Sequence, residues 1–360
     1  MRGKILSLYL HIPFCNSKCG YCAFNSITNQ GELKELYMQK LGVYLRHKLA
    51  SLQEKVQFSS VYIGGGTPSV VRSSFYNDVF KIFVPFLQEG AEISIEANPN
   101  GLSLEWLQDL QSLGVNRLSL GVQSFSAEKL AFLEREHCRE NTFNAIEFAQ
   151  KAGITNLSID LIYGTPLCTE SLLEEELNMA LSLPLSHISA YHLSLDSGSR
   201  FYREQQIAYK QSQKRFEDDF GGFVSIGHFV EAHLEKFLHY EVSNYGKISA
   251  HNLHYWRGGD YIGIGAGAVG CIGNVRTIMP NNIKMFMERF SEQIEVLTSE
   301  DKELEHLFLG FRSCVGVEIA RIANQKKLQM LLQEGILYER EGRVYAKDYF
   351  LGDEIVLFLS

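Results

Sequence analysis

The stretch Tyr9-Leu-His-Ile-Pro-Phe-Cys15-Asn-Ser-Lys-Cys19-Gly-Tyr-Cys22-Ala-Phe24 places three cysteines within eight residues. It begins inside a short apolar run, residues 5–12, that is typical of a β-strand. A loop that leaves the end of a strand can bring three thiolates around one small object. Soft thiolate ligands suit zinc or an iron–sulfur cluster. A four-iron cluster held by only three cysteines would keep one iron open for another ligand.

Two other uses of these thiols compete with a cluster. A disulfide framework is disfavoured, because the chain has seven cysteines, an odd number, and no secretory signal precedes them. A zinc site with His11 as its fourth ligand fits the donor types. His11 also falls within the strand pattern, where it could face inward without binding a metal. The stretch alone therefore leaves zinc open.

The composition is that of an ordinary globular protein. The chain has 360 residues, of which 45% are hydrophobic and 21% are charged. Its formal net charge of -8 argues against a general nucleic-acid-binding protein. No apolar run reaches the roughly 18 residues of a membrane span, and the residues before the cysteines are too few for a signal peptide. We expect a cytoplasmic protein, where thiols stay reduced.

Strand and helix patterns alternate through the first half of the chain. Strands are expected at residues 5–12, 58–63, 92–96, 115–120, 157–162 and 187–193, with helical patterns between most of them. This order implies parallel strands joined by right-handed crossovers. The fold class is therefore α/β, with the six strands in a curved sheet or a partial (β/α)6 barrel that carries its helices outside. In such a fold the functional site lies at the carboxyl ends of the strands.

Polar or glycine-rich clusters stand where these strands end. The cysteine loop follows the first strand and residues 64–67, Gly-Gly-Gly-Thr, follow the second. Glu96, Gln123 and Asp160 mark the ends of the next three. Each signal is weak alone, since a glycine triplet also makes an ordinary turn and a strand-end carboxylate is often only solvated. Because all five would meet at one edge of the sheet, they predict one shared pocket.

The second half of the chain is less regular. A long helix is expected at residues 213–237 and a strand at residues 239–245. The segment His251-Asn-Leu-His254-Tyr-Trp256 then precedes glycines at positions 263, 265 and 267. Glycines at this spacing permit close backbone approach, without the strand–helix context of a dinucleotide-binding fingerprint.

The pattern divides the chain into three expected parts. Residues 1–235 would form the barrel, residues 236–296 a C-terminal extension, and residues 297–360 a small helical unit that ends in a hairpin and resembles a winged helix. Lys326-Lys327 is the basic pair of that last unit. We therefore favour a structural or docking role for it over DNA binding.

The cysteine loop and the clusters together resemble the radical SAM superfamily. More narrowly, they resemble the oxygen-independent coproporphyrinogen III oxidases and their relatives. The motifs that carry this likeness are Tyr9-Leu-His-Ile-Pro-Phe-Cys15, Gly64-Gly-Gly-Thr-Pro68, Glu96-Ala-Asn-Pro99, Gly114-Val-Asn-Arg-Leu-Ser-Leu-Gly-Val-Gln-Ser-Phe125, Ile159-Asp-Leu-Ile-Tyr-Gly164 and His251-Asn-Leu-His-Tyr-Trp256. They extend over about three quarters of the chain, which makes the likeness highly specific.

The resemblance implies cofactors and site residues. It implies a [4Fe–4S] cluster on Cys15, Cys19 and Cys22, whose open iron binds S-adenosylmethionine for one-electron cleavage. The residues it places around S-adenosylmethionine are Tyr9, Gly65, Gly66, Thr67, Glu96, Gln123, Arg135 and Asp160. In the oxidases the last three serve a second S-adenosylmethionine, so the number of such sites here stays open. Arg135 also fits a surface ion pair.

Two departures from the oxidases favour the HemW branch of this family, which is read as haem chaperones. Phe24 stands where the oxidases carry a further cysteine, and the arm before the cluster is short. His251 becomes a candidate axial ligand of haem, with Cys271 and His254 as competitors. A helix cap or a hydrogen bond within a turn is the alternative role of His251.

The resemblance thus predicts a HemW-like haem chaperone that binds the cluster, S-adenosylmethionine and haem. It would deliver haem to acceptor proteins such as respiratory enzymes, without nucleic acid or a membrane span. Peripheral membrane contact and a homodimer are compatible with this prediction. The rival predictions are radical oxidative decarboxylation of coproporphyrinogen III to protoporphyrinogen IX, and a zinc-stabilised docking module.

Overall fold

Six parallel strands form the centre of the protein. The structure is a computed structural model that describes residues 3–28, 30–204, 210 and 222–360. The strands are β1 (Lys4–Ile12), β2 (Val56–Gly65), β3 (Leu87–Ala97), β4 (Arg117–Gln123), β5 (Asn156–Tyr163) and β6 (His187–His192). The helices that accompany them are α1 (Lys34–Ser51), α2 (Asn77–Phe83), α3 (Leu104–Leu113), α4 (Ala127–Phe132), α5 (Arg139–Lys151) and α6 (Glu170–Ser182). Every adjacent pair from β1 to β6 is parallel, which confirms the predicted alternation.

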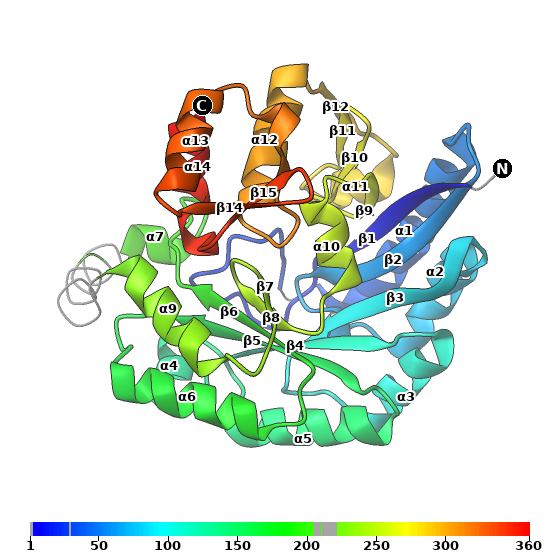
Figure 1. Ribbon diagram of the computed structural model, residues 1–360. Coiled ribbons are helices and arrows are strands. Elements are labelled where there is room, and N and C mark those ends of the chain that lie inside the picture. Colours follow the sequence, from blue (N-terminus) through cyan, green and yellow to red (C-terminus); the bar gives the residue numbers. More distant parts are fainter. Residues whose placement is uncertain (1–2, 29, 205–209, 211–221) are drawn as a thin grey trace.

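Later segments of the chain extend both edges of this sheet. Beyond β6 lie the short strands β8 (Asn244–Gly246) and β7 (His239–Glu241), and beyond β1 lie β9 (Tyr261–Ile264), β10 (Val269–Ile272), β11 (Val275–Ile278) and β12 (Gln293–Val296). The resulting 12-stranded sheet has β12 and β7 as its two ends. The sheet is therefore open, as expected for a partial barrel (Figure 1).

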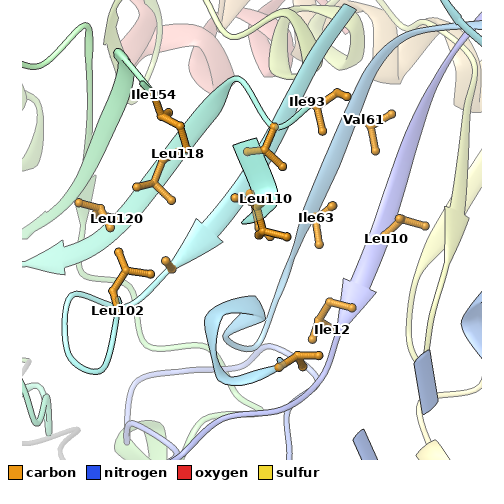
Figure 2. Packing of buried hydrophobic residues seen from close by; sticks show 14 of the residues in the cluster. Leu10, Ile12, Val61, Ile63, Ile93, Leu102, Leu110, Leu118, Leu120 and Ile154 are labelled. Carbon is orange, nitrogen blue, oxygen red and sulfur yellow. The ribbon is translucent and has the colours of Figure 1, made fainter. Parts of the chain in front are cut away.

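The parallel strands alternate between an apolar outer face and a polar inner face. On β4, Leu118 and Leu120 are fully buried in the main core, whereas Ser119 and Gln123 line a cavity. Figure 2 shows Leu118, Leu120 and their neighbours from other strands in this outer core. Burying each such side chain contributes about 1.5–3 kcal/mol. The apolar face holds the helices in place, and the polar face is left for the site.

Local sequence signals place the helices that close the outer layer. Ser103 caps α3 by accepting a hydrogen bond from the backbone N–H of Trp106, at 3.2 Å. Gly114 ends the helix in the left-handed conformation, with φ of 111°. Leu107 and Leu110 then bury the inner face of α3 against the sheet. Two short-range sequence signals thus mark the two ends of α3.

The C-terminal part of the chain covers one end of the barrel. It contains α10 (Ala250–Trp256), α11 (Ile283–Glu288), α12 (Ser299–Phe311), α13 (Gln325–Gln333), α14 (Gly352–Leu359) and the strands β13 (Val317–Glu318), β14 (Leu337–Arg340) and β15 (Arg343–Ala346). The last three strands form a separate antiparallel sheet in the order β13-β15-β14. With α12, α13 and α14 they enclose a second apolar core (Figure 1). We call this the C-terminal unit.

Residues 222–245 differ from the elements expected from the sequence. The strand predicted at residues 239–245 is wrong as a single element, because the chain turns back on itself between β7 and β8, which pair antiparallel. Of the helix predicted at residues 213–237, residues 213–221 lie outside the described part, and α9 (Phe223–His233) accounts for much of the remainder. Among the described residues, the helix before α9 is α7 (Arg200–Glu204). The division into three parts stays a prediction.

Candidate cofactor site

The cysteine loop leaves β1 and is held by its own backbone. The Cys15 N–H donates to the Ile27 carbonyl at 2.9 Å, and the Ile27 N–H donates to the Pro13 carbonyl at 2.7 Å. The loop is thereby closed by a parallel bridge between Phe14 and Ile27. Cys15, Cys19 and Cys22 are all partly exposed and all line one cavity of about 540 Å³, which we call the cluster cavity. The structure therefore brings the three predicted thiols to one shared space.

Polar groups surround the thiols. The Thr67 hydroxyl donates to Cys15 Sγ at 3.4 Å, and Arg135 Nη1 donates to Cys19 Sγ at 3.6 Å. Burial raises the pKa of Cys15 and Cys22, since it removes water from the thiolates. The Arg135 charge and the Thr67 hydrogen bond act in the opposite direction on Cys15. The site thus supplies positive charge and a hydrogen-bond donor where thiolate ligands would stand.

Arg135 is held for this role and is no surface ion pair. Its Nη2 donates to Asn98 Oδ1 at 2.6 Å and to the Gly121 carbonyl at 2.7 Å. These contacts join the loop after β4 to the ends of β3 and β4. The neighbouring Glu134 has a left-handed backbone, with φ of 55°, and its carbonyl accepts from Cys19 Sγ at 3.7 Å. Glu134, whose backbone is strained, therefore belongs to the wall that faces the cysteine loop.

Zinc with His11 as fourth ligand does not fit the structure. His11 Nδ1 is 2.9 Å from the Tyr9 hydroxyl, and His11 Nε2 is 2.8 Å from the Asn25 carbonyl, so both ring nitrogens already have partners. Within the described ranges, no three His, Cys, Asp or Glu side chains are grouped as ligands of a single ion. A zinc ion needs its ligands around one centre, whereas a four-iron cluster takes each thiolate on a different iron.

The glycine triplet at the end of β2 packs directly against the cysteine loop. The Gly66 N–H donates to the Ile12 carbonyl at 2.8 Å, and the Thr67 N–H donates to the Phe14 carbonyl at the same distance. A Cβ on Gly66 would lie 2.8 Å from the Phe14 carbonyl oxygen and 3.0 Å from Cys15 Sγ. Gly65 has φ of 115°, a conformation that favours glycine. The triplet therefore does more than turn the chain, because it allows backbone to approach the thiols.

Two carboxyl groups line the deeper wall of the cavity. Glu96 accepts from the Tyr62 hydroxyl at 2.8 Å and from the Gly65 N–H at 3.0 Å. Its removal from bulk water raises the pKa of Glu96 to about 7, despite these two donors. Burial also raises the pKa of Asp160, which accepts from the Ser119 hydroxyl at 3.3 Å. Glu96 thus changes protonation near neutral pH.

Most of the predicted S-adenosylmethionine residues meet at this cavity. Those that line it together with the three cysteines are Gly65, Gly66, Thr67, Glu96, Gln123, Arg135 and Asp160. Gln123 adopts a left-handed backbone, with φ of 65°, at the end of β4. Tyr9 is set apart, because its hydroxyl is bonded to His11 and its ring lies against Tyr62.

Tyr9 instead lines a second cavity of about 570 Å³ beside the cysteine loop. We call this the lateral cavity. Its walls consist of Tyr9, His11, Lys18, Ala23, Phe24, Asn25, Tyr255, Tyr261, Gly267, Val269 and Asn281. Lys18, Ala23 and Phe24 also line the cluster cavity. The cysteine loop therefore separates the cluster cavity from the lateral cavity.

His251 is buried against Ser60 and Tyr62 of β2 and does not line either cavity in this conformation. It is 1% exposed, with Nδ1 3.0 Å from Ser60 Oγ and Nε2 2.9 Å from the Tyr255 hydroxyl. Burial lowers the pKa of His251 to about 3. Ser249, and not His251, caps α10. The alternative of a hydrogen-bonded histidine thus describes its present state, and ligation of iron by Nε2 would require Tyr255 to move.

The sequence reasoning missed Arg117 as a cavity residue. Arg117 is 2% exposed, lines the cluster cavity and has no hydrogen-bond partner at Nε. Its position two residues before Ser119 and six before Gln123 puts all three on the inner face of β4. Alternation along the strand was therefore the signal that could have found it. Tyr62 and Asn98 belong to the same cavity and escaped notice in the same way.

The fold and the three-thiol loop define a radical SAM protein. Residues 9–180 match the radical SAM superfamily. A solved structure described as coproporphyrinogen III oxidase (HemN) from Escherichia coli aligns with 99% of this chain and 90% of its own, with a TM-score of 0.80 and 22% identity. That likeness concerns the fold.

Curated relatives decide the narrower family. The protein "Heme chaperone HemW" of Bacillus subtilis is 32% identical over 97% of this chain and 97% of its own length. The protein of the same name from Escherichia coli is 35% identical over 85% of this chain and 82% of its own. This chain therefore belongs to the HemW family of haem chaperones. None of the helices among the described residues is long and apolar enough to cross a membrane.

Proposed function

We propose that this protein binds a [4Fe–4S] cluster, S-adenosylmethionine and haem, and that it delivers haem to acceptor proteins in the cytoplasm. One observation carries the cofactor part. Three thiols, a fixed arginine, a glycine cradle and two carboxyl groups line one cavity at the carboxyl ends of the parallel strands. Membership of the HemW family supports the haem part.

The residues present fit the cluster and S-adenosylmethionine. Cys15, Cys19 and Cys22 would hold three irons, and an open iron supplies one-electron cleavage of the carbon–sulfur bond of S-adenosylmethionine when both are bound. The close approach of Gly65, Gly66 and Thr67 to the thiols offers backbone groups to the amino-acid part of that ligand.

The deeper residues would orient the rest of the ligand. Glu96 would accept hydrogen bonds from ribose hydroxyls, for which its two present donors already hold the carboxyl group in place. Gln123, Arg135 and Asp160 would contact its remaining polar atoms or a second molecule of the same ligand. Arg135 has the further task of balancing charge at Cys19. These roles follow the family motifs and the shared cavity.

His251 is proposed either as a ligand of haem iron or as the residue that positions the ligand Tyr255 through their hydrogen bond. Its neutral imidazole, kept neutral by burial, is the form that binds iron. Its Nε2 is covered by Tyr255, which is partly exposed. Haem would therefore meet His251 from the side on which Tyr255 now lies.

One anaerobic titration tests the proposal. Haemin is added to protein carrying a reconstituted cluster, and a Soret band is expected to saturate at stoichiometric haem. His251→Ala should weaken or shift this band, whereas His228→Ala, at a partly exposed site on α9, should not. Wild-type protein without a Soret band, or an unchanged band in His251→Ala, would contradict the haem assignment.

A second assay separates a chaperone from an oxidase. Protein with its cluster is incubated anaerobically with coproporphyrinogen III, S-adenosylmethionine and a reductant. We expect no protoporphyrinogen IX above the level of a Cys15→Ser, Cys19→Ser, Cys22→Ser control. Product above that level would favour the oxidase. Transfer is tested by mixing the haem-loaded protein with an apo-acceptor such as a respiratory enzyme and following the acceptor's haem spectrum.

A further inference from the structure

The lateral cavity is built by segments that are far apart in the sequence. β1 supplies Tyr9 and His11, the cysteine loop supplies Lys18 and residues 23–25, and α10 supplies Tyr255. The opposite wall comes from β9 and the glycine-rich turn that follows it, with Tyr261 and Val269. A space bounded by four separate segments exists only in the folded chain. The roles proposed above for binding the cluster and S-adenosylmethionine do not use this cavity.

Close backbone packing fixes the two walls to each other. Asn25 Nδ2 donates to the Ala266 and Asn281 carbonyls, each at 2.9 Å. The Tyr37 hydroxyl donates to the His11 carbonyl at 2.8 Å and accepts from the Ala266 N–H at 2.9 Å. A Cβ on Gly265 would lie 2.5 Å from the His11 carbonyl oxygen. The glycines at 263–267 are thus needed to dock this turn onto the cysteine loop.

The wall chemistry suits a flat, largely apolar ligand with acidic edges. Tyr9, Phe24, Tyr255 and Tyr261 present four aromatic rings, which stack well on a planar macrocycle. Phe24 is 69% exposed, an unusual position for a large apolar side chain next to a cavity. Lys18 is exposed at the shared rim, where its ammonium group could meet a carboxylate. A volume of about 570 Å³ falls within the range of small-molecule sites.

The same cavity reaches the buried histidine through one hydrogen bond. Tyr255 lines it, and its hydroxyl lies 2.9 Å from His251 Nε2. Phenolate and imidazole are both known ligands of haem iron. The edge-to-face contact between Tyr255 and Tyr261, with ring centroids 4.6 Å apart, holds the pair at the wall.

We propose that haem binds in the lateral cavity, with its macrocycle against the four aromatic rings, its iron towards the Tyr255–His251 pair and a propionate at Lys18. This inference rests on the proposed haem-binding function and locates it. Haem and S-adenosylmethionine would then occupy separate spaces on the two sides of Phe24 and would bind at the same time.

Filling the cavity tests its location. Val269→Trp places a large side chain at the wall, and Val296→Trp, on β12 where Val296 is 65% exposed, is the matched control. Haemin titration of the cluster-loaded proteins should show at least a roughly tenfold weaker haem affinity for Val269→Trp only. The cluster absorbance and S-adenosylmethionine affinity should stay at the wild-type level in both.

A second pair of variants covers the case in which Val269→Trp fails to fold. Tyr261→Ala removes one aromatic wall, and Tyr338→Ala removes a tyrosine of the C-terminal unit that is 40% exposed. Weaker haem binding in Tyr261→Ala alone supports the site. Wild-type affinity in folded Val269→Trp or in Tyr261→Ala overturns it. Absence of haem binding by the wild-type protein instead overturns the proposed function, so the two failures are distinguishable.

Discussion

The interior of the barrel and the interior of the C-terminal unit are filled in opposite ways. In the C-terminal unit, Leu328, Leu337 and Val344 are at most 2% exposed and belong to one cluster of apolar side chains. In the barrel, Arg117 and Asp160 face a cavity of about 540 Å³. Both regions are made of strands covered by helices.

The difference shows where each region obtains its stability. The C-terminal unit closes its core with its own side chains. The barrel keeps its apolar contacts on the outer face of the strands and leaves polar groups inside, where each needs a hydrogen-bond partner. An interior of this kind is suited to a ligand that completes its polar contacts. Four changes test this comparison.

The largest effect is expected from the triple variant Cys15→Ser, Cys19→Ser, Cys22→Ser. It should lose all cluster iron and its visible absorbance, because serine oxygen is a poor ligand for iron in such clusters. The far-ultraviolet circular dichroism should stay close to that of the wild-type protein before reconstitution, since the loop lies outside the core. Cys138→Ser, Cys314→Ser is the matched control at cysteines away from the cavity, and iron loss there would contradict the assignment.

Leu328→Ala should have the largest effect on stability. Leu328 is 0% exposed in the core of the C-terminal unit, and the cavity left behind should cost about 2–5 kcal/mol of the unfolding free energy. Urea unfolding measures this cost, and hydrogen exchange should place it at α13 and β15. Iron content should be unchanged. The exposed neighbour Met330→Ala is the control, with little effect expected.

Glu96→Gln should change how stability depends on pH. The folded protein keeps the Glu96 proton up to a pKa of about 7, against an ordinary value of 4.5. The stabilisation from this group is thus complete below pH 4.5 and is lost as the pH rises to about 7. Since Glu96 is partly open to the cavity, we expect Glu96→Gln to remove a decline on the order of 1–2 kcal/mol.

Urea unfolding at several pH values between 4.5 and 7.5 measures the effect of Glu96→Gln. Glu89→Gln, at an exposed position of the same strand, provides the control. Parallel pH profiles for the wild-type protein and Glu96→Gln would refute the raised pKa.

Ser119→Ala should have the smallest effect on stability, although Ser119 is as buried as the apolar core. Its hydroxyl donates one 3.3 Å hydrogen bond to Asp160, whose loss should cost about 1 kcal/mol. The free energy of S-adenosylmethionine binding should change more than the free energy of unfolding. The reason is that Asp160 would lose a hydrogen-bond partner that lowers its pKa. A cost above that of Leu328→Ala would show that the barrel interior carries the fold after all.

The features that the sequence determined by itself are local ones. Period-two and helical patterns located the six parallel strands and most helices, and Ser103 and Gly114 marked the ends of α3. The cysteine spacing and the polar residues at successive strand ends predicted the shared cavity, because parallel strands necessarily bring their carboxyl ends together. Short-range patterns sufficed for these conclusions.

Only the tertiary structure decided which neighbours those residues have. It placed Tyr9 outside the cluster cavity, hid His251 behind Tyr255, and turned the cysteine loop against the glycines near position 265. It also showed that Arg117, within the motif at residues 114–125, lines the cluster cavity. The contact of the cysteine loop with the glycine-rich turn joins residues 241 positions apart, Asn25 and Ala266. The energy of such a contact depends on packing that no local pattern contains.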